Sequence, residues 1–342
     1  MESFFEHAGC WFLHSGIQQA GGGVARFYRS DTQSYAPVSN EITGYAASTF
    51  AFLGEIDAAE RTARYLTDEA WDPAGHTFPF EAASRLAYFF DIGIIVRGLL
   101  AAYRATREER FLCRARDGAL SLAFDFLGDG FFHPVISLPE KHALEQEAKW
   151  SRSPGCYQLK SALAWRELED EKAARLFELA LDRALASHTA FPEAASDPEK
   201  TMDRLHAYCY FLEALLWETG RAEVRAALES GIERVARLLR DISPVFERSD
   251  VCAQLLRVRL IAHYLEAVPL EEAAAREEAR RAAAYQSSHS DPRLRGGFWF
   301  GQRRGEILPF MNPVSTAFCM QALELWRRHQ SGAWQFELHQ LI

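Results

Sequence analysis

Residues 88–103, YFFDIGIIVRGLLAAY, form an apolar stretch interrupted by only two charged residues, Asp91 and Arg97. Its apolar side chains recur at three- and four-residue spacing, which predicts an α-helix. A helix that is apolar on nearly every side is expected to be buried. Residues 107–126 repeat the helical spacing but carry many charged side chains, so this helix is predicted to lie further out. The short link between the two forces an antiparallel hairpin of one inner and one outer helix.

The same alternation of apolar and charged helices runs along the chain. The spacing predicts twelve helices, over residues 2–19, 42–54, 56–69, 86–105, 107–126, 154–168, 170–188, 202–218, 221–240, 249–266, 269–288 and 313–330. Short turns alternate with long links that are rich in Gly, Pro and aromatic residues. Strand-like pieces occur within the long links, at residues 129–137 and 296–302.

Six inner and six outer helices predict an all-α fold, an (α/α)6 toroid with short β-like loop segments at one face. We expect it to span residues 1–342 as a single domain, with the first helix packed beside the last. An open solenoid of stacked hairpins would show the same alternation. Solenoid repeats have nearly constant length and a shared consensus, whereas these hairpins vary in length. The closed toroid is therefore the preferred prediction.

The composition is that of a folded protein, with 48% hydrophobic and 25% charged residues. A net charge of −9 argues against a nucleic-acid or anionic-membrane partner. No run of about 18 uncharged apolar residues predicts a membrane span, and the N-terminal residues do not resemble a signal peptide. Six isolated cysteines are typical of reduced thiols in a cytoplasmic protein. Nucleotide-binding and zinc-protease motifs are absent, so neither a cofactor nor a metal is expected.

In a toroid of this kind, the long links and the N-terminal ends of the inner helices line one opening. Helix N-termini carry partial positive charge and unpaired N–H groups, which suit acidic or hydroxyl-rich ligands. The candidate substrate-binding residues there are Glu41, Tyr45, Arg85, Tyr88, Trp150, Arg152, Tyr157, Arg204, Tyr208, Trp299, Arg303 and Asn312, and the candidate catalytic residues are Asp91, Asp203 and His206. Aromatic faces and polar groups together fit an oligosaccharide or polysaccharide, and arginine forks would match the carboxylate of a uronic acid.

Several of these residues have a purely structural alternative. Glu41 and Asp203 could cap or stabilise helix starts. His206 lies on an apolar helix, where a histidine is commonly a core residue with satisfied hydrogen bonds. Trp150 and Trp299 could fill the loops.

Asp91 is the hardest residue to explain structurally. It lies one turn into an inner helix, and Ile94 and Ile95 occupy the positions where a helical neighbour could pair with it. A buried carboxyl without a partner should have a raised pKa unless an arginine reaches it. A raised carboxyl pKa suits a general acid that works near neutral pH.

The stretch FFDIGIIVRGLLAAYRATREERFLCRA, residues 89–115, resembles the second inner helix of six-hairpin carbohydrate enzymes, in particular unsaturated glucuronyl hydrolases. In that family a D-[IL]-G motif supplies a catalytic aspartate. GGFWF at residues 296–300 is similar to a stretch in these enzymes and in acylglucosamine epimerase-like proteins. The resemblance implies the toroidal fold and an acid/base role for Asp91.

The chain departs from the hydrolases at the third inner helix. There the sequence WSRSPGCYQLKSALAW, residues 150–165, lacks their second aspartate. Glycosidases generally need two carboxyl groups, so Asp203 or Glu41 would have to supply the second. The leading hypothesis is a glycoside hydrolase that acts on uronate-containing or otherwise acidic oligosaccharides, with Asp91 as the acid/base.

Two alternatives stay open. A polysaccharide lyase or sugar epimerase would need a base such as Tyr157, Tyr208 or His206 to remove a proton from carbon. A sugar-binding or docking scaffold without catalysis would need no second carboxyl.

Overall fold

The structure is a computed structural model and describes residues 4–147, 149–168, 170–192 and 197–342. Twelve α-helices lie in these ranges: α1 Phe4–His14, α2 Asn40–Leu53, α3 Ile56–Tyr65, α4 Phe89–Thr106, α5 Glu109–Asp125, α6 Gln158–Glu167, α7 Glu171–Ser187, α8 Pro198–Leu215, α9 Ala222–Ile242, α10 Ser249–Tyr264, α11 Glu272–Ala283 and α12 Pro313–Gln330. Each predicted helix corresponds to one of them. None of the helices in the described ranges is long and apolar enough to cross a membrane.

The chain divides into two compact units. The first, made of residues 18–26, 37–188 and 339–342, holds the hairpins α2–α3, α4–α5 and α6–α7. The second, made of residues 1–17, 27–36 and 189–338, holds α8–α9, α10–α11 and the pair α12 and α1. The single domain over residues 1–342 stays a prediction.

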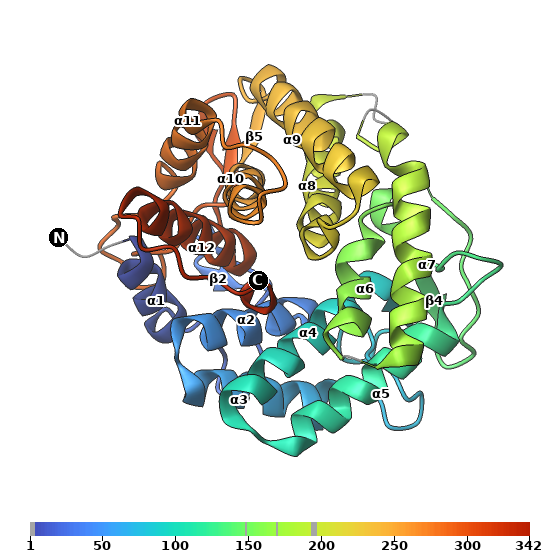
Figure 1. Cartoon of the computed structure of the whole chain (residues 1–342). Coiled ribbons are helices and arrows are strands. Elements are labelled where there is room, and N and C mark those ends of the chain that lie inside the picture. The colour runs from blue at the N-terminus through green and yellow to red at the C-terminus, as the bar shows by residue number, and fades with distance from the viewer. Residues whose placement is uncertain (1–3, 148, 169, 193–196) are drawn as a thin grey trace. The chain divides into compact units, whose positions relative to one another are not determined.

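In the first unit, α4 lies between α2 and α6, and α5 packs against it (Figure 1). Two glycines of α4 allow its backbone to lie close to α6 and α2. A Cβ added at Gly93 would lie 2.3 Å from Ser161 Cβ on α6, and one at Gly98 would lie 2.3 Å from the Gly44 carbonyl oxygen on α2. The glycine of the D-I-G sequence therefore has a packing role, because it lets two helix backbones approach closely.

Gly93→Ala is expected to lower the free energy of unfolding by about 1–3 kcal/mol, the usual range for overpacking a core. The added methyl group would meet backbone and Cβ atoms of Ser161 rather than the end of a flexible side chain. Urea unfolding measures the effect. Gly220→Ala is the control, since nothing lies within 4 Å of an added Cβ there. Equal stability of the two variants would contradict the close contact.

In the second unit, α10 lies between α8 and α12, and α9 and α11 pack against it (Figure 1). The predicted packing of the first helix beside the last is confirmed, because α1 packs on α12. The inner helix α10 is buried from Ser249 to Ala262 and includes the completely buried Arg257. The Arg257 guanidinium bonds to Glu213 of α8 and to Gln321 of α12, with a 2.9 Å distance from Nη1 to Gln321 Oε1.

Short antiparallel sheets lie before the inner helices. The strands are β1 Tyr28–Arg29, β2 Ser34–Tyr35, β3 Leu86–Tyr88, β4 Val135–Ser137, β5 Phe246–Arg248, β6 Gly301–Arg303, β7 Glu306–Ile307 and β8 Phe310–Met311. They form the sheets β2-β1-β8, β3-β4 and β5-β6-β7. Strand β3 leads directly into α4, and β5 leads directly into α10. The sheets thus fix where these two inner helices begin.

Several helix starts differ from the predicted ones by a few residues, and two of these differences have a clear physical reason. Helix α4 begins at Phe89 rather than at residue 86, because residues 86–88 pair with β4. Helix α8 begins at Pro198 rather than at residue 202. The Asp197 side chain caps it by accepting a hydrogen bond from Lys200 N at 2.9 Å, and proline suits the first helical position. Asp203 therefore lies in the second turn of α8.

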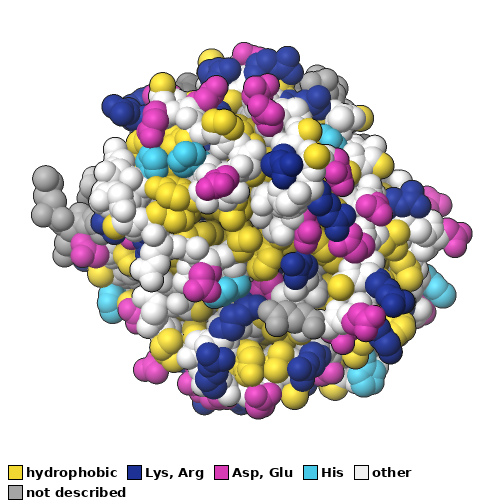
Figure 2. All heavy atoms as spheres, in the orientation of Figure 1, with side chains coloured by type: hydrophobic (Ala, Val, Ile, Leu, Met, Phe, Trp, Pro, Cys, Tyr) yellow, Lys and Arg dark blue, Asp and Glu magenta, His cyan; other side chains and the backbone are white. Residues whose placement is uncertain are grey.

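The surface mixes charges of both signs. On the face shown in Figure 2, Lys and Arg side chains are interspersed with Asp and Glu side chains. Interspersed charges give a weaker long-range field than a patch of one sign. This face is therefore poorly suited to attract a long polyanion.

Candidate active site

Glu41 and Asp91 lie in the first turns of two adjacent inner helices, α2 and α4. Their helices touch three to four residues further on, where Gly44 approaches the backbone of Ile95. Ser39 is the N-cap of α2, so Glu41 does not serve as that cap. The glycine contact therefore brings two carboxyl groups near one another, close enough for the charge of Glu41 to raise the pKa of Asp91.

Asp91 is a buried carboxyl group with only 7% of its surface exposed. Its Oδ2 atom is buried and has no hydrogen-bond partner within the described part of the chain. Burial raises the pKa of Asp91 well above its usual value, and the charge of Glu41 raises it further. The positive charges of Arg26 and Lys149 lower it in part. Since a buried, unpartnered carboxylate is costly, the protonated acid is the expected form at neutral pH.

Glu41 has a different environment from Asp91. The residue keeps partial solvent access, but the protein around its carboxyl group raises its pKa to about 7. The Arg26 guanidinium opposes this rise. Arg26 is itself held by Glu81, with 2.6 Å from Nη2 to Oε1, and lies over the ring of Phe80. Glu41 can therefore ionise near neutral pH while Asp91 stays protonated.

Aromatic side chains surround the start of α4. The rings of Trp150 and Tyr157 are 4.9 Å apart, and Phe90 lies 6.4 Å from Trp150 and 6.0 Å from Tyr157. Burial raises the pKa of Tyr157, and its hydroxyl donates to Ser153 O at 3.0 Å. A phenol held in this way is a poor base. Trp150 keeps partial exposure and offers an aromatic surface.

Tyr88 and Arg152 are also brought together in this unit. Arg152 Nε donates to the Tyr88 hydroxyl at 3.3 Å, and the guanidinium also bonds to Glu147. The ring of Tyr88 lies 5.1 Å from that of Phe80. Tyr88 is the N-cap residue of α4, so both predicted residues lie beside the start of the helix that carries Asp91.

The second unit holds a separate cluster around Arg248, the last residue of β5. Arg248 binds Asp250 in a bidentate pair, at 3.0 Å from Nε and 2.7 Å from Nη2, and donates from Nη1 to Asp203 Oδ1 at 2.8 Å. It also lies over the ring of Phe300. Burial alone would raise the pKa of Asp250. The charges of Arg248 and His206 and the hydrogen bond from Arg248 lower it by more, so the pKa of Asp250 lies below its usual value. Asp203 is thus the partner of an arginine.

His206 is fixed at both ring nitrogens. Its Nδ1 lies 2.8 Å from Gln254 Oε1, and its Nε2 lies 2.9 Å from the Tyr210 hydroxyl. Burial, together with the charge of Arg248, lowers the pKa of His206 to about 4. The imidazole is therefore neutral at pH 7. One of the two nitrogens would have to give up its present partner before the ring could move a proton to or from a substrate.

Other predicted residues lie in varied surroundings. Tyr45 is buried, and Arg85 is exposed. Arg204 donates to Phe191 O at 3.3 Å and lies over that ring.

Tyr208 lies against Gly231 of α9, toward the outer helix of its hairpin. Trp299 accepts a hydrogen bond at its carbonyl from Ser249 Oγ at 2.7 Å. Arg303 pairs with Glu199 at 2.8 Å. Asn312 caps α12 by accepting from Val314 N and Ser315 N. The substrate contacts assigned to these residues stay predictions.

Sequence reasoning did not single out Arg26 or Arg248. Arg26 lies in an irregular stretch without helical spacing, so no periodic pattern marks it. Arg248 stands two residues before Asp250 at the start of an inner helix, and this spacing could have indicated the pair. Within the described ranges, no group of three or more His, Cys, Asp or Glu side chains could hold a metal ion.

No family model and no curated protein sequence matches this chain. Solved structures do match over nearly its whole length. A cellobiose 2-epimerase from Spirochaeta thermophila has a TM-score of 0.70 at 15% identity, covering 96% of this chain and 95% of that one. An α-mannanase from Bacteroides thetaiotaomicron has a TM-score of 0.65 at 12% identity, covering 96% and 98%. A D-mannose isomerase has a TM-score of 0.64 at 11% identity, covering 95% and 97%.

The chain has the fold of these carbohydrate enzymes. It is the all-α (α/α)6 toroid predicted from the sequence, with small antiparallel sheets. The predicted resemblance to six-hairpin carbohydrate enzymes is thereby confirmed at the level of fold. An unsaturated glucuronyl hydrolase specific for heparin also matches, but at a TM-score of 0.46, which is too low to bear on the reaction.

Proposed function

We propose that this chain is a glycoside hydrolase in which Asp91 is the general acid and Glu41 is the second carboxyl group. The observation that carries the proposal is the pair itself: the buried Asp91, whose Oδ2 has no partner among the described residues, and Glu41 in the first turn of the adjacent inner helix. Burial raises the pKa of Asp91 well above its usual value and that of Glu41 to about 7. Two carboxyl groups with separated pKa values are what glycoside hydrolysis requires. Hydrolases are among the proteins that share the fold, as the α-mannanase illustrates.

In the proposed reaction, Asp91 donates its proton to the glycosidic oxygen while the bond from that oxygen to the anomeric carbon breaks. Ionised Glu41 meets the positive charge that develops on the anomeric carbon, either directly or by taking a proton from the attacking water. Water supplies the hydroxyl group of the new sugar end, and its other proton returns to the carboxyl pair. Arg26 supports this role because its charge favours the ionised form of Glu41.

For the substrate, we propose a neutral rather than an acidic sugar. The sequence favoured uronates because arginines stand near the helix starts. Two of these arginines are bound to carboxylates, Arg152 to Glu147 and Arg303 to Glu199. Arg248, which the sequence did not single out, is likewise bound to Asp203 and Asp250. A uronate would have to compete with these partners, and it would also meet the negative charge of Glu41.

A sugar epimerase or isomerase is the second candidate, because such enzymes share the fold at TM-scores up to 0.70. That chemistry needs a group that removes a proton from carbon. The fixed ring nitrogens of His206 and the raised pKa of Tyr157 argue against both as bases. The carboxyl pair therefore supports hydrolysis better.

The assay is a panel of neutral and uronate oligosaccharides incubated with the full chain. Hydrolysis predicts new reducing ends from a neutral member of the panel. An epimerase would instead exchange a carbon-bound proton with D2O without chain cleavage, and a lyase would create an ultraviolet-absorbing double bond. Binding without any of these changes would identify a scaffold and contradict the hydrolase.

The pH dependence of kcat is expected to follow the carboxyl pair. Activity should rise as Glu41 ionises near pH 7 and fall at higher pH as Asp91 loses its proton. The two apparent pKa values belong to the coupled pair rather than to either residue alone. Glu41→Gln removes a negative charge that raises the pKa of Asp91. In this variant, the fall of the residual activity at alkaline pH should therefore begin at a lower pH. An unchanged profile in Glu41→Gln would contradict the pairing.

A further inference from the structure

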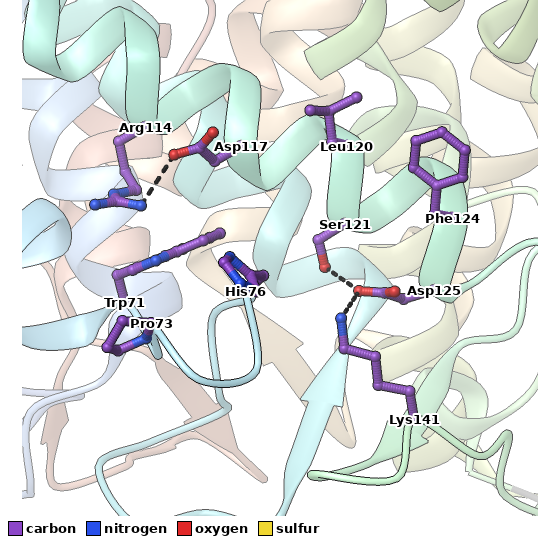
Figure 3. A pocket seen from close by; sticks show the side chains of 10 residues that line it. All are labelled: Trp71, Pro73, His76, Arg114, Asp117, Leu120, Ser121, Phe124, Asp125 and Lys141. Carbon is purple, nitrogen blue, oxygen red and sulfur yellow. Dashed lines mark hydrogen bonds and ion pairs between the residues drawn. The ribbon is translucent and has the colours of Figure 1, made fainter.

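A cavity of about 580 Å³ lies beside the outer helix α5 in the first unit (Figure 3). Its lining comes from one face of α5, from the loop after α3 and from Lys141 after β4. The residues are Trp71, Pro73, His76, Arg114, Asp117, Leu120, Ser121, Phe124, Asp125 and Lys141. Neither Glu41 nor Asp91 contributes to this lining. The volume is within the usual range for small-molecule sites.

Two groups of polar side chains in the lining are each held in place by hydrogen bonds among their members. Ser121 Oγ and Lys141 Nζ both donate to Asp125 Oδ2, at 2.8 Å and 2.7 Å (Figure 3). Arg114 Nη1 donates to Asp117 Oδ2 at 3.0 Å. Because these bonds use one oxygen of each acid, the other oxygen can accept from a ligand hydroxyl group. Lys141 Nζ carries further N–H donors beyond its single bond to Asp125.

Two apolar side chains of the lining, both on α5, are unusually exposed. The Phe124 side chain is 79% exposed and Leu120 is 54% exposed. Leaving a phenyl ring in water forgoes the stabilisation that burial would give. Leu120 and Phe124 stand four residues apart on α5, so they lie on one helical face and together offer a ligand an apolar surface. Trp71 does not provide this surface, because the Arg114 guanidinium covers its ring at 4.4 Å.

The charges that line the cavity balance. Arg114 and Lys141 oppose Asp117 and Asp125, so the lining offers no net attraction for an anion or a cation. A phenyl face next to fixed donors and acceptors fits a ring with apolar C–H faces and hydroxyl groups at its edge. We infer that this cavity is a second carbohydrate site, which binds neutral sugar units apart from the acid pair.

The inference is tested by affinity electrophoresis of the full chain in gels containing a soluble β-glucan, a soluble α-mannan or a polyuronate. Wild-type protein and Asp91→Asn should be retarded equally by at least one neutral polysaccharide. Phe124→Ala should weaken that binding by about tenfold, which corresponds to the loss of one aromatic contact. Leu127→Ala is the matched control, since Leu127 is also an exposed apolar residue beside α5 but does not line the cavity.

Turnover of a short neutral substrate should be unchanged in Phe124→Ala, because such a substrate needs only the acid pair. Equal retardation of Phe124→Ala and wild type would overturn the inference. So would a lack of retardation by both neutral polysaccharides, or retardation by the polyuronate alone. Binding that persists in a protein without hydrolase activity would uphold this site and refute only the proposed reaction.

Discussion

Asp91→Asn is expected to lower kcat by about 10²- to 10⁴-fold, the usual contribution of a positioned general acid. Asparagine has nearly the same shape as aspartic acid but no transferable proton, so substrate binding should change much less than kcat. Steady-state kinetics on the neutral oligosaccharide that the wild type cleaves measures the effect. Asp129→Asn, a change at an exposed aspartate, is the control and should keep full activity. Full activity in Asp91→Asn would place the chemistry elsewhere.

The stability of Asp91→Asn separates a catalytic loss from a folding defect. The pKa of Asp91 is raised in the folded chain, so the folded state favours the protonated acid. This contribution to stability is fully present below the unfolded pKa of about 4 and is lost as the pH rises toward the folded pKa. Asparagine never ionises. The variant should therefore be no less stable than wild type at pH 7, and its relative stability should increase between about pH 4 and pH 7. Thermal unfolding across this range measures the trend.

Glu213→Ala is expected to lower the free energy of unfolding by about 3–5 kcal/mol, because it leaves the buried Arg257 charge without its carboxylate. Both side chains are completely buried, at 0% exposure. Arg257 also bonds to Gln321 and lies 4.0 Å from the centre of the Phe318 ring. These neutral contacts do not replace the lost negative charge.

Denaturant unfolding of Glu213→Ala should be compared with that of Glu199→Ala. Glu199 pairs with Arg303 at the surface, with 46% and 49% of the two side chains exposed. Exposed pairs contribute between about 0 and 1 kcal/mol, so this control should change stability little. A loss of stability in Glu213→Ala no greater than in the control would show that water reaches Arg257.

The fold was predictable because its signal is repeated along the chain. Each inner helix is apolar on nearly all sides and each outer helix has a charged face, so an error at one helix leaves the pattern intact. The exact ends of the helices were harder to predict than their order. The Asp197–Pro198 pair marks the true start of α8 through capping, but the apolar spacing becomes regular only some residues later.

The candidate site was predictable in part. Asp91 stood out because a carboxyl group in an apolar helix is costly. The pairing of Asp91 with Glu41 depends on the close packing of Gly44 against α4. This pairing could not be predicted, because helical spacing within one segment does not show which helices touch. Likewise, the ion pairs of the arginines cannot be read from helical spacing. Glu199 lies 104 residues from Arg303, and Glu147 lies in the irregular link just before Arg152.

The most direct test of the Glu41–Asp91 pair is a carboxyl ¹³C NMR titration of the full chain, with Asp91→Asn used to assign the Asp91 resonance. We expect Asp91 to hold its proton well above the usual pH for an aspartate, and Glu41→Gln to move the Asp91 titration to lower pH. An Asp91 resonance that titrates near pH 4, or one that Glu41→Gln leaves unmoved, would show that the two carboxyl groups do not form a pair.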